Sequence, residues 1–330
     1  MAIEQEDPNA PNAPDAPNAP KIETPVECTI KVNGAEIKYS ITSVKLKQYI
    51  DAHHVLKVTI SPDLAGNDNI ADPGQYSSLL GQSISLGIAP STDKVDASSA
   101  LEFIGIVTEV RFENSVDNIN VLVLTAKSPT FAMDGTKKNS FSSELTASDA
   151  ISSVLGKYQI TLGEIDATSK TMPYSVQYRE TDYAYIMRLA ASAGKFAFYD
   201  GKEFRLVSAS SSDEHELSWR ENLGSFSLGL GTVSCNFRGS SYNYMDDSAQ
   251  DDSTSAGSSK TSLSPFSKTS FDASEEMFDD PGYWDDVEMI EDAKALGDVL
   301  ENEKARAMGK MINGHGQDRK STRLNSSHRL

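Results

Sequence analysis

The chain lacks the features of a disulfide-stabilised protein or a membrane protein. Its 330 residues include only two cysteines, Cys28 and Cys235, which lie far apart in the sequence. We expect free cytosolic thiols, with a disulfide as the alternative. No apolar run approaches the length of a membrane span, and the N-terminus lacks the charged, apolar and small-residue regions of a secretory signal. The sequence therefore predicts no signal peptide and no membrane insertion by this segment.

Motifs of enzymatic chemistry are also missing. The sequence contains no nucleophile elbow, phosphate-binding loop, zinc-ligand spacing or nucleotide-binding fingerprint. We predict no catalytic residues, no cofactor and no metal, and therefore not an enzyme. The adjacent His53 and His54 would point to opposite faces of a strand, which favours structural roles over a metal site. His315 is isolated in the sequence.

Positive charge is scarce, and the negative charge is unevenly placed. The net charge is −18, and no basic stripe appears, which argues against nucleic-acid partners. The segment from Asp246 to Glu303 holds 17 acidic and only three basic side chains, a net charge of −14. Its Asp-Asp pairs lack the spacing, glycine turn and later glutamate of a calcium loop, and the apolar pocket that acid catalysis needs. We predict a solvated acidic loop, disordered over residues 246–269, because apolar residues are almost absent there.

Both ends of the chain have unusual composition. Residues 8–20 read PNAPNAPDAPNAP, and proline at every third position prevents helix and sheet. We predict a disordered arm over residues 1–24, with binding to a partner as an alternative role. Residues 317–330 are basic and rich in Ser and Asn after a long acidic region. We expect them to be a foreign tail that does not continue the preceding strand, and the gene to be cut short.

The clearest local pattern lies between Pro173 and Val207. Tyr174, Val176 and Tyr178 alternate with polar residues, which is typical of a strand with one buried face. Thr181 suits a helix N-cap, and Gly194 suits the left-handed residue that closes a helix. Two further strands flank an Asp-Gly turn at 200–201. We predict a strand, a helix and a hairpin, with the helix stripe packed inside its own domain; that stripe is Tyr183, Ile186, Met187 and Ala190.

Alternating apolar residues predict further strands on both sides of this unit. They cover about 26–60, with a hairpin turn at Asn33-Gly34, and 79–86, 101–112 and 119–126 before it, and short stretches between 217 and 244 after it. A helix is predicted from the caps Thr146 or Ser148 to Gly156, and a long helix over 287–311. Lys137 and Lys138 are interpreted as part of a solvated loop.

One family resembles this chain in residue identity as well as in pattern. The stretch from 177 to 198 resembles the spike protein VgrG of type VI secretion systems and the related hub proteins of contractile phage tails. It matches a strand ending in Gln-Tyr-x-Glu-(Ser/Thr)-Asp, then a helix with Arg-Leu, then Gly and an aromatic strand. The matching residues are Gln177, Tyr178, Glu180, Thr181, Asp182, Arg188, Leu189, Gly194, Phe196 and Phe198. Weaker likeness extends over residues 26–316.

The resemblance implies a fold. We expect an α+β, mainly β protein with two related small β-barrel domains and flanking helices. The first barrel would be discontinuous, built from residues 25–139 and 225–316, with the second barrel inserted at 140–224. Strands after residue 225 would then pair with strands of residues 26–127. The oligonucleotide/oligosaccharide-type barrel and needle that follow in the family are not present in this sequence.

The resemblance also implies a function. We expect a structural hub or spike component of a contractile injection machine, forming a homotrimeric collar at the tip of the tube for effector delivery. Its partners would be the hexameric tube protein, baseplate proteins and effector or adaptor cargo. It would be cytoplasmic at assembly and then exported through the apparatus. The alternatives are a phage or phage-derived tail baseplate hub and a hub fused to a cell-wall hydrolase that the truncation removed.

Overall fold

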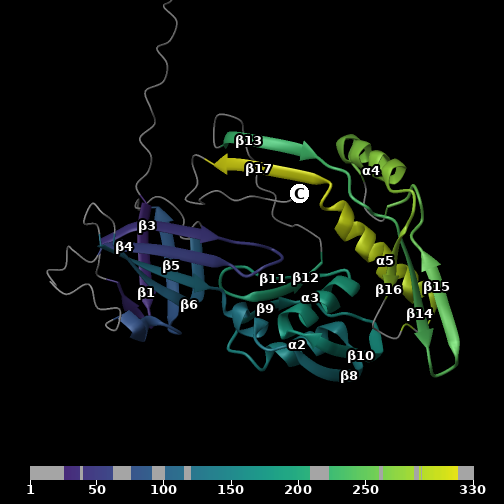
Figure 1. Cartoon of the computed structure of the whole chain (residues 1–330), viewed down its shortest axis with the longest axis horizontal. Coiled ribbons are helices and arrows are strands. Elements are labelled where there is room, and N and C mark those ends of the chain that lie inside the picture. The colour runs from purple at the N-terminus through teal and green to yellow at the C-terminus, as the bar shows by residue number, and fades with distance from the viewer. Residues whose placement is uncertain are drawn as a thin grey trace, which may run out of the picture.

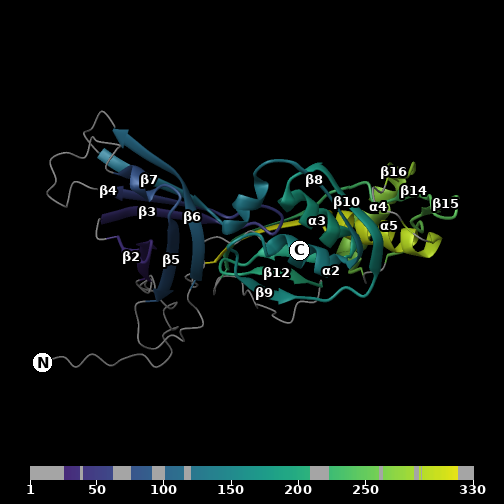
Figure 2. The same cartoon turned by 90° about the horizontal axis from the view of Figure 1, so that it is seen from below.

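The computed structural model divides into three regions along the chain (Figures 1 and 2). An N-terminal sheet is followed by a small unit of helices and strands, and a C-terminal region lies beyond that unit. The structure describes residues 26–37, 40–61, 76–90, 101–114, 120–208, 223–259, 263–285, 290 and 292–318. The predicted arm at 1–24 lies outside these described residues.

The N-terminal region is a seven-stranded antiparallel sheet with the order β2-β1-β5-β6-β7-β4-β3. As predicted, Asn33 and Gly34 form the first tight turn, and both have the positive φ that such a hairpin turn requires. Alternating side chains such as Leu56, Val58 and Ile60 are buried, because successive residues of a strand face opposite sides. The strands are β1 (Val26–Val32), β2 (Ala35–Glu36), β3 (Ser40–Lys47), β4 (Val55–Ser61), β5 (Ser83–Pro90), β6 (Leu101–Asn114) and β7 (Asn120–Lys127).

Gly105 in β6 is required for close packing. A Cβ atom at this position would lie 2.7 Å from the ring of Phe103 and 2.8 Å from the carbonyl oxygen of Lys127. The bulge in this strand falls a little later, between Val107 and Glu109. The glycine therefore admits the buried Phe103 ring, and it is not the bulge residue.

The middle region contains the predicted strand, helix and hairpin. Thr181 caps α3 by accepting a hydrogen bond from the amide of Ala184, and Gly194 has a φ of +67° just after the helix. Thr146 caps α2 in the same way and accepts from the amide of Asp149. The elements are η4 (Pro129–Asp134), β8 (Lys138–Thr146), α2 (Ala147–Leu155), β9 (Leu162–Ile165), β10 (Thr171–Glu180), α3 (Asp182–Ser192), β11 (Phe196–Tyr199) and β12 (Phe204–Val207).

A single hydrophobic core joins the sheet to this middle region. It runs from Ile30 and Leu56 in the sheet through Phe103 to Ile186 and Leu206. The backbone also connects the two parts, because the amide of Ile104 donates to the carbonyl of Gly201 at 2.7 Å. Ile186 and Ala190 are buried in this core with Phe204 and Leu206 of the hairpin, as predicted for a stripe packed inside its own domain, and the core extends further into the N-terminal sheet.

The C-terminal region forms two separate small sheets. Among the described residues, β13 (Leu223–Leu230) pairs with β17 (Ile312–Asp318) alone, and a second sheet has the order β15-β14-β16. These three strands are β14 (Phe237–Asn243), β15 (Ser248–Ser253) and β16 (Gly282–Asp285). The predicted ladders between strands after 225 and the N-terminal sheet are wrong for the described residues. Apolar alternation identifies a strand, but it does not determine which strand is its partner.

Several boundary predictions in this region need correction. Residues 246–269 are not a disordered loop where the structure describes them, because they contain β15 and the start of α4 (Pro265–Met277). The predicted helix over 287–311 is shorter: α5 spans Ala293–Met308, and its N-cap is Asp292. β17 continues through Asp318, so the strand includes the first two residues of the predicted tail. The remaining tail, residues 319–330, lies outside the described residues.

The fold class is mainly β with some helices, as predicted. The ladders of the described residues do not close either region into a barrel. Figure 2 shows the N-terminal sheet at one end, the middle region at the centre, and α4, α5 and the β15-β14-β16 sheet at the other end.

Candidate functional site

The described residues hold no group of three or more His, Cys, Asp or Glu side chains that could bind a metal ion. None of the helices within the described ranges is long and apolar enough to cross a bilayer. The predicted acidic pairs Asp246-Asp247 and Asp279-Asp280 are described, and they belong to no such group. The side chains that remain to be explained form buried polar networks and exposed apolar faces.

The family signature forms one buried network. The carboxylate of Asp182 is fully buried, and it accepts hydrogen bonds from Lys138 at 2.6 Å, Tyr158 at 2.5 Å and Gln177 at 2.8 Å. Burial would raise the pKa of Asp182, but these three donors outweigh it and hold the pKa below its usual value. The interpretation of Lys138 as part of a solvated loop is therefore wrong. Its ammonium group binds the buried carboxylate of Asp182 and connects β8 to α3.

A second part of the signature fixes the helix against its strand. Arg188 donates to Glu180 at 2.7 Å and to the backbone carbonyl of Val176 at 2.7 Å. Thr181, besides capping α3, donates to Asp134 at 2.7 Å. The polar residues of the signature thus hold β10, α3 and the preceding segment together. Their chemistry is structural, and no substrate is needed to explain it.

The two adjacent histidines lie just before β4, not on a strand, and their side chains diverge. His53 contacts Thr130 through Nδ1 at 2.9 Å and Asp134 through Nε2 at 3.3 Å. His54 is buried, and its Nε2 donates to the carbonyl of Tyr49 at 3.0 Å. Its Nδ1 has no hydrogen-bond partner in the part of the chain that the structure describes. Both histidines connect the N-terminal sheet to its surroundings, as a structural role implies.

We expect His54 to make the fold sensitive to mild acid. Burial lowers the pKa of His54 below its usual value, so the folded chain resists protonation while the unfolded chain binds a proton below about pH 6.5. The contribution of His54 to the free energy of unfolding is therefore fully present above about pH 6.5. It falls as the pH drops from 6.5 toward the pKa of His54 in the folded chain, by up to about 1.4 kcal/mol per pH unit. Urea unfolding between about pH 7.5 and 5.5 measures this slope.

His54→Phe should reduce that slope, because it removes the group that the unfolded chain protonates. His315→Phe is the control, since His315 lies exposed on β17. An equal slope in wild type and His54→Phe would contradict the assignment.

A buried lysine organises the C-terminal region. Lys304 of α5 is only 1% exposed, and its Nζ donates to Ser255 O at 2.8 Å, Asn236 Oδ1 at 3.1 Å and Glu275 Oε1 at 3.3 Å. It also lies 5.1 Å from the centre of the Phe271 ring. A buried ammonium needs such partners, because burial without them is strongly unfavourable. One side chain therefore joins α5, α4, the residue before β14 and the segment after β15.

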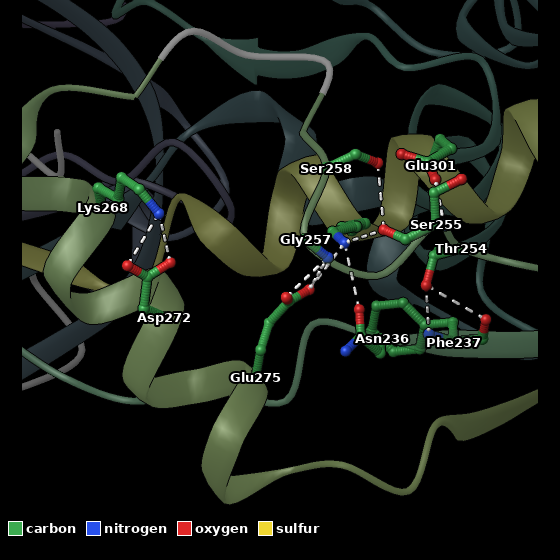
Figure 3. Close-up of polar contacts among 11 residues, drawn as sticks. Asn236, Phe237, Thr254, Ser255, Gly257, Ser258, Lys268, Asp272, Glu275 and Glu301 are labelled. Atoms are coloured by element: carbon green, nitrogen blue, oxygen red, sulfur yellow. Dashed lines mark hydrogen bonds and ion pairs between the residues drawn. The ribbon is translucent and has the colours of Figure 1, made fainter.

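The segment after β15 is held by further acidic side chains (Figure 3). Glu275 accepts from the amide of Gly257 at 2.9 and 2.7 Å, and Glu301 accepts from the amide of Ser255 at 3.0 Å. The hydroxyl of Thr254 accepts a hydrogen bond from the amide of Phe237 and donates one to its carbonyl oxygen. These bonds explain why a segment with few apolar residues is ordered, since side chains satisfy its backbone directly.

An exposed aromatic face covers the outer side of the β8–β10 pair. We predicted from the alternation that Tyr174, Val176 and Tyr178 face a core, and this is wrong. The intervening Ser175 and Gln177 are buried instead, because they hydrogen-bond Tyr185 and Asp182. Phe141, 70% exposed, and Tyr178, 69% exposed, face outward with the half-buried Tyr174 and Val176. We call these four residues the aromatic face.

A second exposed apolar face lies on the β13–β17 pair. Leu228 is 47% exposed and Leu230 is 43% exposed. Phe226 and Ile312 lie on the same side, because Phe226, Leu228 and Leu230 pair with Gly316, Gly314 and Ile312 across the ladder. We call Phe226, Leu228, Leu230 and Ile312 the ribbon face. Exposed apolar faces of this kind mark protein contacts, so these two are the candidate functional sites.

Comparisons with known proteins agree with this architecture. The sequence model of a family described as phage tail baseplate hub (GPD) matches residues 55–310. No curated protein matches the chain significantly.

Solved structures share the fold at low sequence identity. The prophage MuSo2 43 kDa tail protein from Shewanella oneidensis has a TM-score of 0.58 and 13% identity, covering 88% of this chain and 82% of that chain. The tail protein from Neisseria meningitidis MC58 has a TM-score of 0.58 and 12% identity, covering 88% and 79%. An Escherichia coli component of the type VI secretion system has a TM-score of only 0.44 and 13% identity, covering 62% and 56%, and supports no argument here.

Proposed function

Because this chain belongs to the phage tail baseplate hub (GPD) family, we propose that it is a structural hub component of a contractile, tail-like injection machine. The observation that carries the proposal is the extent of the family match, which runs from β4 to just beyond α5. The signature residues support it as well, because their hydrogen bonds hold β10, α3 and the preceding segment together. The work of such a protein is assembly.

In this proposal three copies form a collar at the tip of the tube. The collar would contact the hexameric tube protein on one side and baseplate proteins on the other, and it would carry effector or adaptor cargo in a secretion machine. Two related domains per chain would give three chains the pseudo-six-fold surface that a hexameric tube needs. The protein would assemble in the cytoplasm and leave the cell through the apparatus.

A tail particle is the favoured setting, and the type VI secretion spike is the alternative. The family match is to a tail baseplate hub, which supports the tail particle. The resemblance to VgrG rests on the signature between Gln177 and Phe198, whose polar residues stabilise the shared fold and therefore do not distinguish the two machines. Neighbouring genes distinguish them: a disassembly ATPase accompanies secretion, whereas capsid and terminase genes accompany a phage.

Deletion of the gene in its host tests the role. We expect electron micrographs of the deletion strain to lack complete baseplate-capped tails or sheaths, because tube polymerisation has no hub on which to start. The intact gene supplied in trans should restore them. Complete particles in the deletion strain would contradict the hub role.

A further inference from the structure

Some dipeptides of this chain carry the groups for a reaction within their own backbone. Where glycine follows asparagine or aspartate, the amide nitrogen of the glycine has no side chain beside it. That nitrogen can therefore attack the side-chain carbonyl carbon of the preceding residue and close a five-membered ring. The pairs of this kind in the sequence are Asn33-Gly34, Asp134-Gly135, Asp200-Gly201 and Asn313-Gly314.

The two aspartates are held away from this reaction. The carboxylate of Asp134 contacts His53 and accepts a hydrogen bond from Thr181 at 2.7 Å. The carboxylate of Asp200 accepts from Arg205 and from two backbone amides at 2.7 to 2.8 Å. Near neutral pH an aspartate is also ionised, and a carboxylate carbon attracts a nitrogen nucleophile less than an amide carbon does. Both carboxylates therefore stay in place.

The second asparagine lies in the middle of β17. Asn313 pairs with Gly229 and Gly314 pairs with Leu228 across the ladder, and the carboxamide of Asn313 donates to the carbonyl of Lys310 at 3.4 Å. Ring closure needs rotation of the backbone between the two residues of the pair, and a strand holds this backbone extended. The nitrogen of Gly314 therefore reaches the carboxamide only when β13 and β17 separate.

Asn33 lacks these restraints. Asn33 and Gly34 are exposed and form the two-residue turn between β1 and β2, with φ values of 50° and 78°. Within the described part of the chain, the side chain of Asn33 makes no hydrogen bond. Beyond the neighbouring residues, no atom lies within 4 Å of the position that a Cβ of Gly34 would take. The carboxamide is therefore free to turn toward Gly34, and water reaches it.

The surrounding sheet also tolerates a change at this turn. β2 is an edge strand of the seven-stranded sheet (Figure 2), and its ladder with β1 consists of the pairs Lys31–Glu36 and Val32–Ala35. The ladder between β1 and β5 is much longer and does not include the turn. A distorted turn therefore affects β2 and leaves the core of the sheet paired.

We propose that Asn33 is a site of spontaneous covalent modification, at which the chain converts a carboxamide into a carboxylate. The backbone nitrogen of Gly34 loses its proton and bonds to the side-chain carbonyl carbon of Asn33, and the amide nitrogen of that side chain leaves as ammonia. Water then opens the resulting succinimide ring. Cleavage between the ring nitrogen and the side-chain carbon gives aspartate, whereas cleavage between the nitrogen and the backbone carbon gives isoaspartate.

Both products change the edge of the N-terminal sheet. Each adds one negative charge to a chain whose net charge is −18. Isoaspartate also lengthens the main chain by one carbon atom, and a two-residue hairpin turn requires a fixed length. We therefore expect the isoaspartate form to lose the pairing of β2 with β1 and to keep the pairing of β1 with β5.

Peptide mapping by mass spectrometry tests the proposal on the purified full chain, incubated in mildly alkaline buffer because the attacking nitrogen must lose its proton. Asn313 is the internal control, since it is followed by the same residue. In the folded chain we expect Asn33 to convert at least about tenfold faster than Asn313, a factor that ~1.4 kcal/mol of ladder opening produces. In urea the two sites should convert at similar rates, because the fold no longer distinguishes them.

A protein isoaspartyl methyltransferase supplies a second readout, because it labels isoaspartate and not aspartate. The incubated wild type should accept label, and Asn33→Gln should lose most of it, since glutamine would have to close a less favourable six-membered ring. Asn313→Gln is the matched variant and should be labelled like wild type. Circular dichroism checks that both variants are folded.

Three results would overturn the inference: an unmodified Asn33 in the folded chain, equal conversion of Asn33 and Asn313 in the folded chain, or full labelling of Asn33→Gln. The hub role does not depend on any of them, since deletion of the gene tests it separately.

Discussion

Ile186→Asp is expected to abolish the fold of the middle region. Ile186 is completely buried in the core that α3 shares with β11, β12 and the N-terminal sheet. An aspartate there has no described cation beside it, so the change combines a lost apolar side chain with an unpaired buried charge, at about 4 kcal/mol or more. That is a large share of the ~5–15 kcal/mol that stabilises a typical domain. Circular dichroism and chemical unfolding should show a largely unfolded chain.

Tyr178→Asp is the matched control, because the same substitution is made in the same region on an exposed side chain. It should remain folded, because an exposed charge at this position costs little. A folded, soluble and monomeric Ile186→Asp would mean that the helix stripe is a subunit interface and that the packing described above is wrong.

Lys304→Ala is expected to destabilise the C-terminal region by about 3–5 kcal/mol. The substitution removes the donor of the Asn236 amide oxygen and one of the two donors of the Ser255 carbonyl, and it leaves the carboxylate of Glu275 without its buried cation. Limited proteolysis should then cut first between β15 and α4, where these bonds hold the chain. Urea unfolding followed by tryptophan fluorescence measures the loss of stability.

Lys294→Ala is the control, because Lys294 lies on the same helix with an exposed side chain. It should unfold like wild type within about 0.5 kcal/mol. Lys304→Met separates charge from volume, since it fills the space without donating. If Lys304→Met were as stable as wild type, the hydrogen bonds would not be the source of the stability.

Local structure was predictable from the sequence wherever local chemistry determines it. The Asn33-Gly34 turn, the Thr181 cap and the Gly194 stop each require a particular side chain or a positive φ, and the structure confirms all three. The burial of Ile186 was also predictable, because the apolar stripe of a helix next to a hairpin is buried most favourably against that hairpin.

Long-range pairing and polar burial were not predictable in this way. The alternation predicts the wrong buried face for β10. Gln177 and Ser175 are buried because they hydrogen-bond Asp182 and Tyr185 of α3, and these bonds outweigh the hydropathy of Tyr174 and Tyr178. Composition predicts disorder for the acidic segment because nothing in it indicates that Lys304, some fifty residues later, binds the backbone of Ser255. Polar segments are ordered by specific partners, and composition alone does not reveal these partners.

The mutual bonding within the signature network implies a constraint on how this chain varies over evolution. Lys138 donates to Asp182, and Arg188 donates to Glu180. A substitution of one member of either pair is therefore tolerated best when the other member also changes. In a deep collection of related sequences these positions should therefore change in concert, Lys138 with Asp182 and Glu180 with Arg188.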